Sequence, residues 1–388
     1  DPGPWLNRPM RKALGLPQPE AAIGYAAHDV TTLLAGPRVV LTRALKINGV
    51  PTVPSRWLLR IDALLGGLGL VDALKPKLPW LSWAMHRDHA PPRKPADRPQ
   101  PKPPVEMRPR ELSVTAIEKW IADPYAIFAE HILALHEMPG LGEDPDAALR
   151  GQILHEALGR FARLHPTKLP ADIEGELLKA ARVAMGEALI HPRVRAFWWP
   201  RFERFAAWFA EEEPKLRQAA RAVHAEVNGA MVLAAPGGPF KLKARADRLD
   251  ERADGIAIFD YKTGTPPSKK RVDAGHAPQL PLEAAIVAGR GFPALESAKT
   301  VELSYITVKG GEPPGEVVKV TPDDVAELIA RQQEALTALI ARFDDPATPY
   351  LALRRPGAGF EAAYRYSRYD QLARVKEWHG EDGDGGEA

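Results

Sequence analysis

The sequence contains no cysteine among its 388 residues. This absence excludes disulfides, thiolate zinc sites, cysteine-held iron–sulfur clusters and a cysteine nucleophile, so any metal must be bound by histidine and carboxylate side chains. No apolar run approaches the ~20 residues that cross a bilayer. A phosphate-binding loop of the form Gly-x-x-x-x-Gly-Lys-Ser/Thr is also missing, so we expect no ATP site in this chain.

The chain has little excess of either charge. It carries 52 lysine and arginine residues against 50 aspartate and glutamate residues, a formal net charge of +2. Any affinity for nucleic acid must therefore come from local charge and metal chemistry. The length suggests two or three domains. The opening DPGPWLNRPMRKAL lacks the layout of a secretory signal and does not begin with Met, so we expect a fragment of a longer protein.

A proline-rich stretch divides the chain. Residues 91–110 hold eight prolines, six basic and two acidic residues, a composition that favours extended chain, and we assign 86–111 as a basic linker. Residues 1–85 precede it, with a short strand predicted at Arg38–Thr42 and a helix around Ser55–Leu68. The main domain is predicted over 112–376. Residues 377–388 combine acidic residues with glycine, which indicates a disordered acidic tail.

Helical patterns open the main domain. Thr115-Ala-Ile-Glu118 resembles a capping box, and the helix must break at Asp123-Pro124. Leu149, Ile153, Ala157 and Phe161 recur every four residues, which predicts a helix from about Ala148 to Leu164 that carries His155. A later aromatic stripe is more typical of core than of a base-stacking platform; it comprises Trp198, Phe202, Phe205 and Phe209.

The period then changes from helix to strand. Strand-like runs at Val223–Leu233, Phe240–Leu249 and Gly255–Tyr261 are separated by turn residues. A helix from Gln279 to Val287, a strand at Val301–Val308 and a long helix after Thr321-Pro322 follow. The predicted class is α/β, with a core in the order helix, three strands, helix, strand.

Candidate chemistry concentrates in these strands. In FDYKTG, Asp260 and Lys262 are two residues apart, so both side chains lie on one face of a strand and Tyr261 lies on the other. Asp247 ends the preceding strand, and adjacent strands lie ~5 Å apart, so its carboxylate can reach Asp260. Crowded carboxylates repel unless a cation lies between them. Oxygen ligands of this kind suit Mg²⁺, and a histidine ligand favours tolerance of Mn²⁺.

Taken together, these motifs resemble the PD-(D/E)XK nuclease superfamily in its RecB-like branch. The shared pattern is Gly151-x-x-x-His155 on a helix, Asp247, then Asp260-x-Lys262 and Gln279. The resemblance implies the αβββαβ core, hydrolysis of DNA phosphodiesters, and metal ligation by His155, Asp247, Asp260 and the backbone carbonyl of Tyr261. It also implies that Lys262 orients water or stabilises the developing charge.

Further positions follow from the same resemblance. Glu226 on the first strand matches an acidic catalytic position of this family. Gln279 matches the start of the family's Gln-x-x-x-Tyr element, but Glu283 occupies the tyrosine place. Other readings of single residues remain open: a lone Asp-x-Lys is usually a solvated face, and a lone histidine such as His155 is usually structural.

The roles of several basic residues also have two possible interpretations. Arg245 and Arg248 either pair with acids or face phosphates, and nothing in the sequence separates the two. Lys269, Lys270 and Arg271 form a basic run just after the Asp-x-Lys strand. Such a run is usually solvated, although it could also contact a DNA backbone.

A narrower resemblance covers most of the chain. LSVTAIEKWIADPYAIFAEHILAL is similar to the segment that leads into the nuclease domain of AddB-type subunits of AddAB helicase–nucleases, with Asp123 where a cluster-ligating cysteine often stands. Residues 24–65 resemble the end of their degenerate helicase-like half, with Thr42-Arg43 at the place of a motor arginine. This resemblance implies DNA and an AddA-like subunit as partners, a cytoplasmic bacterial location and double-strand break repair. A stand-alone RecB-like exonuclease and a non-catalytic DNA-binding scaffold are the alternatives.

Overall fold

The computed structural model describes residues 5–75, 78–89, 97–138, 140, 144–352 and 367–378. It divides the chain into two units, with the boundary between Arg93 and Lys94, inside the proline-rich stretch. We call residues 1–93 the amino-terminal unit and residues 94–388 the carboxy-terminal unit.

The amino-terminal unit consists of helices and one two-stranded hairpin. Its elements are α1 (Arg8–Ala13), α2 (Ala21–Leu34), β1 (Lys46–Ile47), β2 (Val50–Pro51), α3 (Arg56–Gly67), a 3-10 turn (Val71–Leu74) and α4 (Trp80–Asp88). The predicted helix around Ser55–Leu68 is confirmed, since Ser55 caps α3 by accepting from Leu58 N. The strand predicted at Arg38–Thr42 is wrong. Its β-branched residues have strand propensity, but that propensity needs a neighbouring strand to take effect.

A six-stranded mixed sheet forms the centre of the carboxy-terminal unit. The strands are β3 (Glu111–Ser113), β4 (Ala220–Leu233), β5 (Phe240–Arg252), β6 (Ile256–Lys262), β7 (Thr300–Val308) and β8 (Gly315–Lys319). The path through the sheet is β3-β5-β6-β7-β8, and β4 pairs along the other edge of β5. β6 and β7 are parallel, so the chain must cross over between them.

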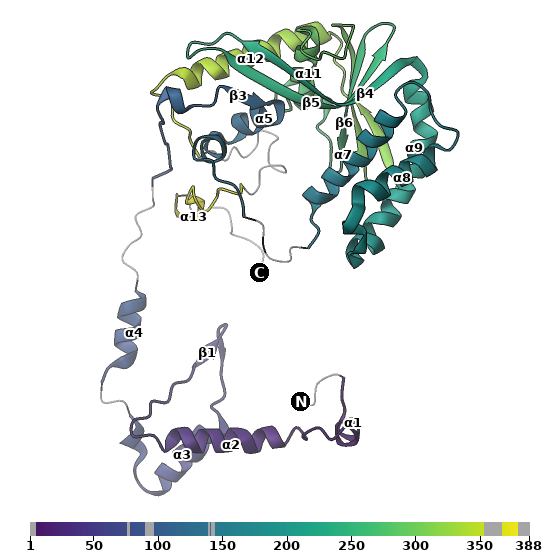
Figure 1. Cartoon of the computed structure of the whole chain (residues 1–388). Helices are drawn as coiled ribbons and strands as arrows, with labels where there is room; N and C mark the ends of the chain where they lie inside the picture. Colours follow the sequence, from purple (N-terminus) through teal and green to yellow (C-terminus); the bar gives the residue numbers. More distant parts are fainter. Residues whose placement is uncertain are drawn as a thin grey trace. The chain divides into compact units, whose positions relative to one another are not determined.

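Helices cover both faces of this sheet (Figure 1). One hydrophobic cluster packs α5, α11 and α12 against one face, and a second packs α7, α8 and α9 against the other. The α-helices of this unit are α5 (Val114–Ala122), α6 (Pro124–Ile127), α7 (Ala147–Leu164), α8 (Ile173–Met185), α9 (Trp199–Leu216), α10 (Lys269–Asp273), α11 (Gln279–Ala288), α12 (Val325–Asp344) and α13 (Val375–Trp378). The architecture is therefore a three-layer α/β/α arrangement.

The predicted αβββαβ order is confirmed by α7, β4, β5, β6, α11 and β7. Two details differ. The cap of α5 is Ser113, whose hydroxyl accepts from Ala116 N, so Thr115 lies inside the helix and the predicted capping box is wrong. The short strands β3 and β8 were not predicted, because three and five residues are too few to show a period. The break at Asp123-Pro124 is confirmed, as α5 ends at Ala122.

The end of the proline-rich stretch packs against the rest of the carboxy-terminal unit. Pro99 O and Pro101 O accept from Ala352 N and Tyr350 N. The Arg108 guanidinium, 3% exposed, donates to backbone carbonyls at the end of α12, including Phe343 O at 2.6 Å. Part of the predicted 86–111 linker thus packs on the domain that follows it. Of the predicted acidic tail, residues 379–388 lie outside the described residues.

Candidate metal centre

The site begins where two neighbouring strands separate. β5 and β6 pair from Glu251 and Ile256 as far as Arg248 and Phe259, and no further. Two residues beyond Phe259, Tyr261 N donates to the Asp247 side chain, Oδ2, at 2.9 Å. The Asp247 carboxylate therefore stands in the fork between the strands, and only 11% of its side chain is exposed.

The side-chain alternation of β5 changes at the same point. Ala246 and Leu249, three residues apart, both pack in the cluster beneath α11 and α12. Arg248 contacts Glu213 of α9 on the opposite face. Regular strands alternate every two residues, so the phase shifts across Asp247 and Arg248. This irregularity aims Asp247 at the helix layer that carries α7.

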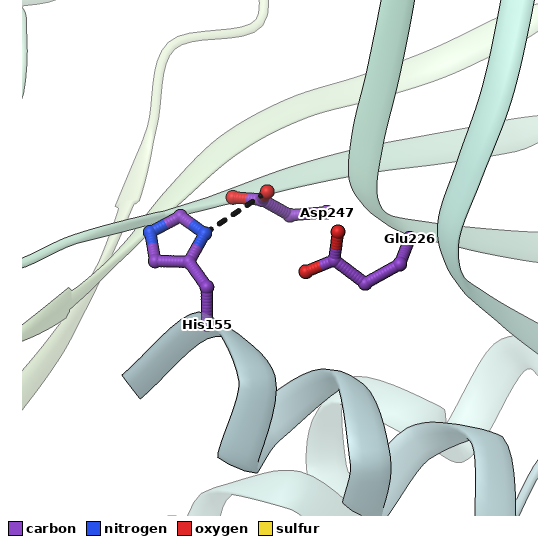
Figure 2. A group of neighbouring side chains, drawn as sticks. All are labelled: His155, Glu226 and Asp247. Atoms are coloured by element: carbon purple, nitrogen blue, oxygen red, sulfur yellow. Dashed lines mark hydrogen bonds and ion pairs between the residues drawn. The ribbon is translucent and has the colours of Figure 1, made fainter. Parts of the chain in front are cut away.

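Three side chains from separate elements converge there. Each of His155 (α7), Glu226 (β4) and Asp247 (β5) offers one nitrogen or carboxylate oxygen, and these atoms lie within 4.8 Å of one another. His155 Nδ1 lies 3.1 Å from Asp247 Oδ1 (Figure 2). Glu226 stands opposite Asp247 with a φ of 57°, a strained value for a residue with a side chain.

A glycine lets the helix approach this close to the sheet. A Cβ on Gly159, one turn beyond His155 on α7, would lie 2.8 Å from Glu226 Cγ and 3.1 Å from an Arg163 nitrogen. Gly151, at the other end of the Gly-x-x-x-His motif, meets nothing closer than Thr263 Oγ1 at 4.0 Å. The close contact is therefore made at Gly159.

A second group lies on the other face of β6. Asp260 and Lys262 are both on that face, as predicted, with Lys262 Nζ 2.8 Å from Asp260 Oδ2. Gln279, at the start of α11, bridges them: its Nε2 donates to Asp260 Oδ1 at 2.5 Å and its Oε1 accepts from Lys262 Nζ at 3.0 Å. Tyr261 packs in the opposite cluster.

Burial and mutual repulsion set the charges of the two groups. Burial raises the pKa of Asp260 to about 6, and Asp247 adds to the rise while Lys262 opposes it. Burial also raises the pKa of Glu226, again with a contribution from Asp247. Burial alone would lower the pKa of His155 and of Lys262, but the neighbouring carboxylates outweigh it and raise both. The two groups together carry more carboxylates than cations, and this excess of negative charge makes each of these side chains release its proton at a higher pH than usual.

Further acids surround Lys262. Glu283, in the tyrosine place of the family motif, is 1% exposed, and its Oε1 lies 3.3 Å from Gln279 Nε2. Burial raises the pKa of the Glu283 carboxyl well above its usual range. Glu118, which the sequence indicated only as part of a cap, is influenced electrostatically by Lys262 and Asp260. The lysine therefore lies in an acidic, largely buried setting.

The donor set at the fork fits a divalent cation. Two carboxylates converge beside an imidazole, and such an arrangement is unfavourable without a proton or cation to compensate it. Carboxylate oxygens are the ligands that Mg²⁺ uses, and the imidazole nitrogen is acceptable to Mn²⁺. His155, Glu226 and Asp247 are the residues that would hold the ion.

The structure brings the predicted site residues into two groups. His155, Glu226 and Asp247 form the first; Asp260, Lys262 and Gln279 form the second, and Tyr261 joins them through its backbone N. Asp260 was predicted as a ligand beside Asp247, but its carboxylate contacts Gln279 and Lys262.

Gly159 was not singled out from the sequence. The one feature that could have drawn attention to it is the presence of a glycine inside a helical pattern.

The structure also shows which partners Arg245 and Arg248 contact, a question that the sequence left open. Arg248 is fully buried and pairs with acids, Glu213 at 2.6 Å and Asp250 at 2.7 Å. Arg245 is 63% exposed and pairs with Glu226 at 2.6 Å. The aromatic stripe is core as predicted, since Phe202, Phe205 and Phe209 are buried in the cluster with α7 and α8.

Comparison with known proteins gives the family. Residues 111–354 match the PD-(D/E)XK nuclease superfamily, which is more than half of the chain, so the chain belongs to that superfamily. Among curated proteins, it is 24% identical over 298 residues to an uncharacterised protein of Rickettsia conorii, covering 74% of this chain and 34% of that protein. An uncharacterised protein of Rickettsia typhi is 27% identical over 207 residues, covering 52% and 24%. The chain spans about a third of the length of the first of these relatives.

Among the described residues, none of the helices combines the length and the apolar character that a membrane crossing requires.

Proposed function

We propose that this chain is a Mg²⁺-dependent deoxyribonuclease that accepts Mn²⁺ as a substitute. The observation that carries the proposal is the convergence of His155, Glu226 and Asp247 at the fork between β5 and β6. Membership of the PD-(D/E)XK superfamily supports the same reaction class. A divalent cation held there would neutralise phosphate charge and lower the pKa of water for attack on phosphorus.

The protein's own groups have separable tasks in this proposal. Asp247 fixes the His155 ring through Nδ1 and is itself held by Tyr261 N. Gln279 and Asp260 hold the Lys262 ammonium, which keeps its proton because the carboxylates around it raise its pKa. A fixed positive charge stabilises a phosphodiester transition state, whose charge is more negative than that of the ground state. No covalent nucleophile is required.

We further propose that the chain is part of an AddB-like subunit, acting with an AddA-like motor in the bacterial cytoplasm on double-strand breaks. The support is the similarity of residues 24–65 and of the segment around Asp123 to such subunits. The longer relatives leave room for additional domains. In this assignment the amino-terminal unit is the end of a helicase-like domain, and no iron–sulfur cluster is bound because cysteine is absent.

Cleavage of end-labelled single-stranded DNA tests the proposal. Wild type, Asp247→Asn and the exposed control Asp72→Asn are compared with Mg²⁺, with Mn²⁺ and with EDTA. We expect metal-dependent cutting by wild type and by the control, and loss of cutting in Asp247→Asn. If wild type alone is silent, an AddA-like partner and ATP are added. Silence under those conditions would contradict the proposed function.

A further inference from the structure

One row of exposed cations leads along β5 to the metal centre. From Phe240 the strand alternates buried and exposed residues without interruption, and the exposed positions are Lys241, Lys243 and Arg245, followed by half-buried Asp247. The buried positions Phe240, Leu242, Ala244 and Ala246 all pack into the cluster with α5, α11 and α12. The cations and Asp247 therefore share one face of the strand. We call Lys241, Lys243 and Arg245 the cation row.

The neighbouring strand leaves this row open. The β4 residues opposite the cation row are Val232, Ala230 and Asn228, which are uncharged and small or medium in size. Side chains opposite each other on paired strands lie on the same face. The row runs over about 13 Å from Lys241 to Arg245, at ~3.3 Å per residue, and the pair formed by Glu226 and Asp247 lies two residues further along the strand.

In the structure, each cation of the row is paired with a carboxylate. Glu111 of β3 contacts Lys243 and lies 3.3 Å from Lys241 Nζ, and the two lysines lower the pKa of the Glu111 carboxyl. Lys241 and Lys243 remain about half exposed, at 49% and 48%. Arg245 contacts Glu226, a member of the candidate metal centre. An exposed ion pair of this kind is weak and can exchange one anion for another.

We propose that the cation row is the track along which the phosphate backbone of a DNA strand reaches the metal centre. The proposal rests on the proposed function and adds the path of the substrate. Phosphates would take the place of Glu111 on Lys241 and Lys243, and Arg245 would carry the backbone to Glu226 and Asp247. Regular spacing on one rigid strand suits a polyanion better than a single small anion, because successive phosphates meet successive cations.

The double variant Lys241→Ala/Lys243→Ala tests the track in the full chain. Binding of a fluorescent single-stranded oligonucleotide is measured by anisotropy in EDTA across a KCl series, and cleavage is measured with Mg²⁺. The matched control is Lys179→Ala/Lys215→Ala, which removes two lysines that are also paired with carboxylates but lie on α8 and α9. Both variants change the net charge equally.

We expect the track variant to lower the slope of log Kd against log salt by about 1.4, at ~0.7 for each lost phosphate contact, and the control to keep the wild-type slope. KM for DNA should rise while kcat at saturating DNA is kept. An unchanged slope and KM, or an equal loss in the control, would overturn the track while leaving wild-type cleavage, and so the proposed function, intact. If wild type neither binds nor cuts DNA, the proposed function itself fails.

A gain-of-binding variant covers the case in which the alanine variant misfolds. Glu111→Gln removes the competing carboxylate and retains every lysine. We expect it to lower the Kd for the oligonucleotide severalfold at low salt. A Kd equal to or above that of wild type would count against the track.

Discussion

At the scale of single residues, Lys262 is the group whose position is most closely determined. Its ammonium is held between Gln279 Oε1 and Asp260 Oδ2, and the ring of Tyr305 lies 5.8 Å away. Because the ammonium is already held in place, it loses little conformational entropy when negative charge develops in the transition state. Its contribution to catalysis should therefore be separable from metal binding.

Replacing Lys262 should impair chemistry and spare the metal. We expect Lys262→Ala to lower the cleavage rate by about 10²-fold or more, as for removal of other preorganised charges, with metal affinity within a few fold of wild type. Single-turnover cleavage and a Mn²⁺ titration measure the two quantities. Lys179→Ala, which removes an exposed lysine paired with Glu176 on α8, is the control. An undiminished rate in Lys262→Ala would refute the role given to this residue.

The pH dependence of metal binding follows from His155. Burial opposes protonation of His155, but Asp247, Asp260 and Glu226 outweigh it and raise the pKa above the ordinary histidine value, and the metal-free imidazole is protonated below that raised pKa. A protonated imidazole cannot ligate, so metal and proton compete. As the pH falls below that value, Mn²⁺ affinity should drop by about tenfold per pH unit for each displaced proton. Calorimetry on wild type and His155→Gln measures this. A Kd independent of pH in wild type would contradict it.

At the scale of elements, the buried ion network behind Asp247 fixes the fork. Arg248, fully buried, joins Glu213 of α9 to Asp250 of β5, and Arg217 also binds Glu213. Arg248→Met would remove the positive charge that is paired with the buried carboxylates of Glu213 and Asp250. We expect it to lower the free energy of unfolding by about 3–5 kcal/mol in urea denaturation.

The control for this prediction is a surface pair on the same helix. Lys215 is 66% exposed and pairs with Glu212, so Lys215→Met should cost less than about 1 kcal/mol. Equal stabilities of the Arg248 and Lys215 variants would show that the buried network does not support the fork.

Helix α7 offers a matched pair of glycines. We expect Gly159→Ala to displace Glu226 and weaken Mn²⁺ binding by about tenfold or more, because the new Cβ would lie 2.8 Å from Glu226 Cγ. Gly151→Ala has space and should keep metal binding while gaining about 0.5–1 kcal/mol of helix stability. Mn²⁺ titration and thermal unfolding distinguish them. If the two variants bind Mn²⁺ alike, the close approach at Gly159 is not needed.

Periodicity made most of the main domain predictable. Helix α7, the three strands and the return strand β7 were predicted because their burial patterns repeat over many residues. The pairing of Asp260 with Lys262 followed from strand alternation. The convergence of Glu226 with His155 was expected only from the family resemblance and not from periodicity, because it depends on a strained φ at Glu226 and a phase shift at Asp247, and neither leaves a local pattern.

At the scale of the whole molecule, both groups of site residues belong to the carboxy-terminal unit. The amino-terminal unit buries none of its residues within 5–75 and 78–89, and large apolar side chains such as Leu64 and Trp83 are more than half exposed. Exposed apolar surface on this scale is typical of interaction sites. The candidate metal centre and the apolar surface thus belong to different units of the chain.

The central claim is that His155, Glu226 and Asp247 bind one divalent ion, and Mn²⁺ binding measured by electron paramagnetic resonance tests it most directly. Wild-type chain should bind one Mn²⁺, displaced by excess Mg²⁺, and Asp247→Ala should lose it. The control Asp72→Asn should behave as wild type. Mn²⁺ bound with the same affinity by wild type and Asp247→Ala would contradict the account.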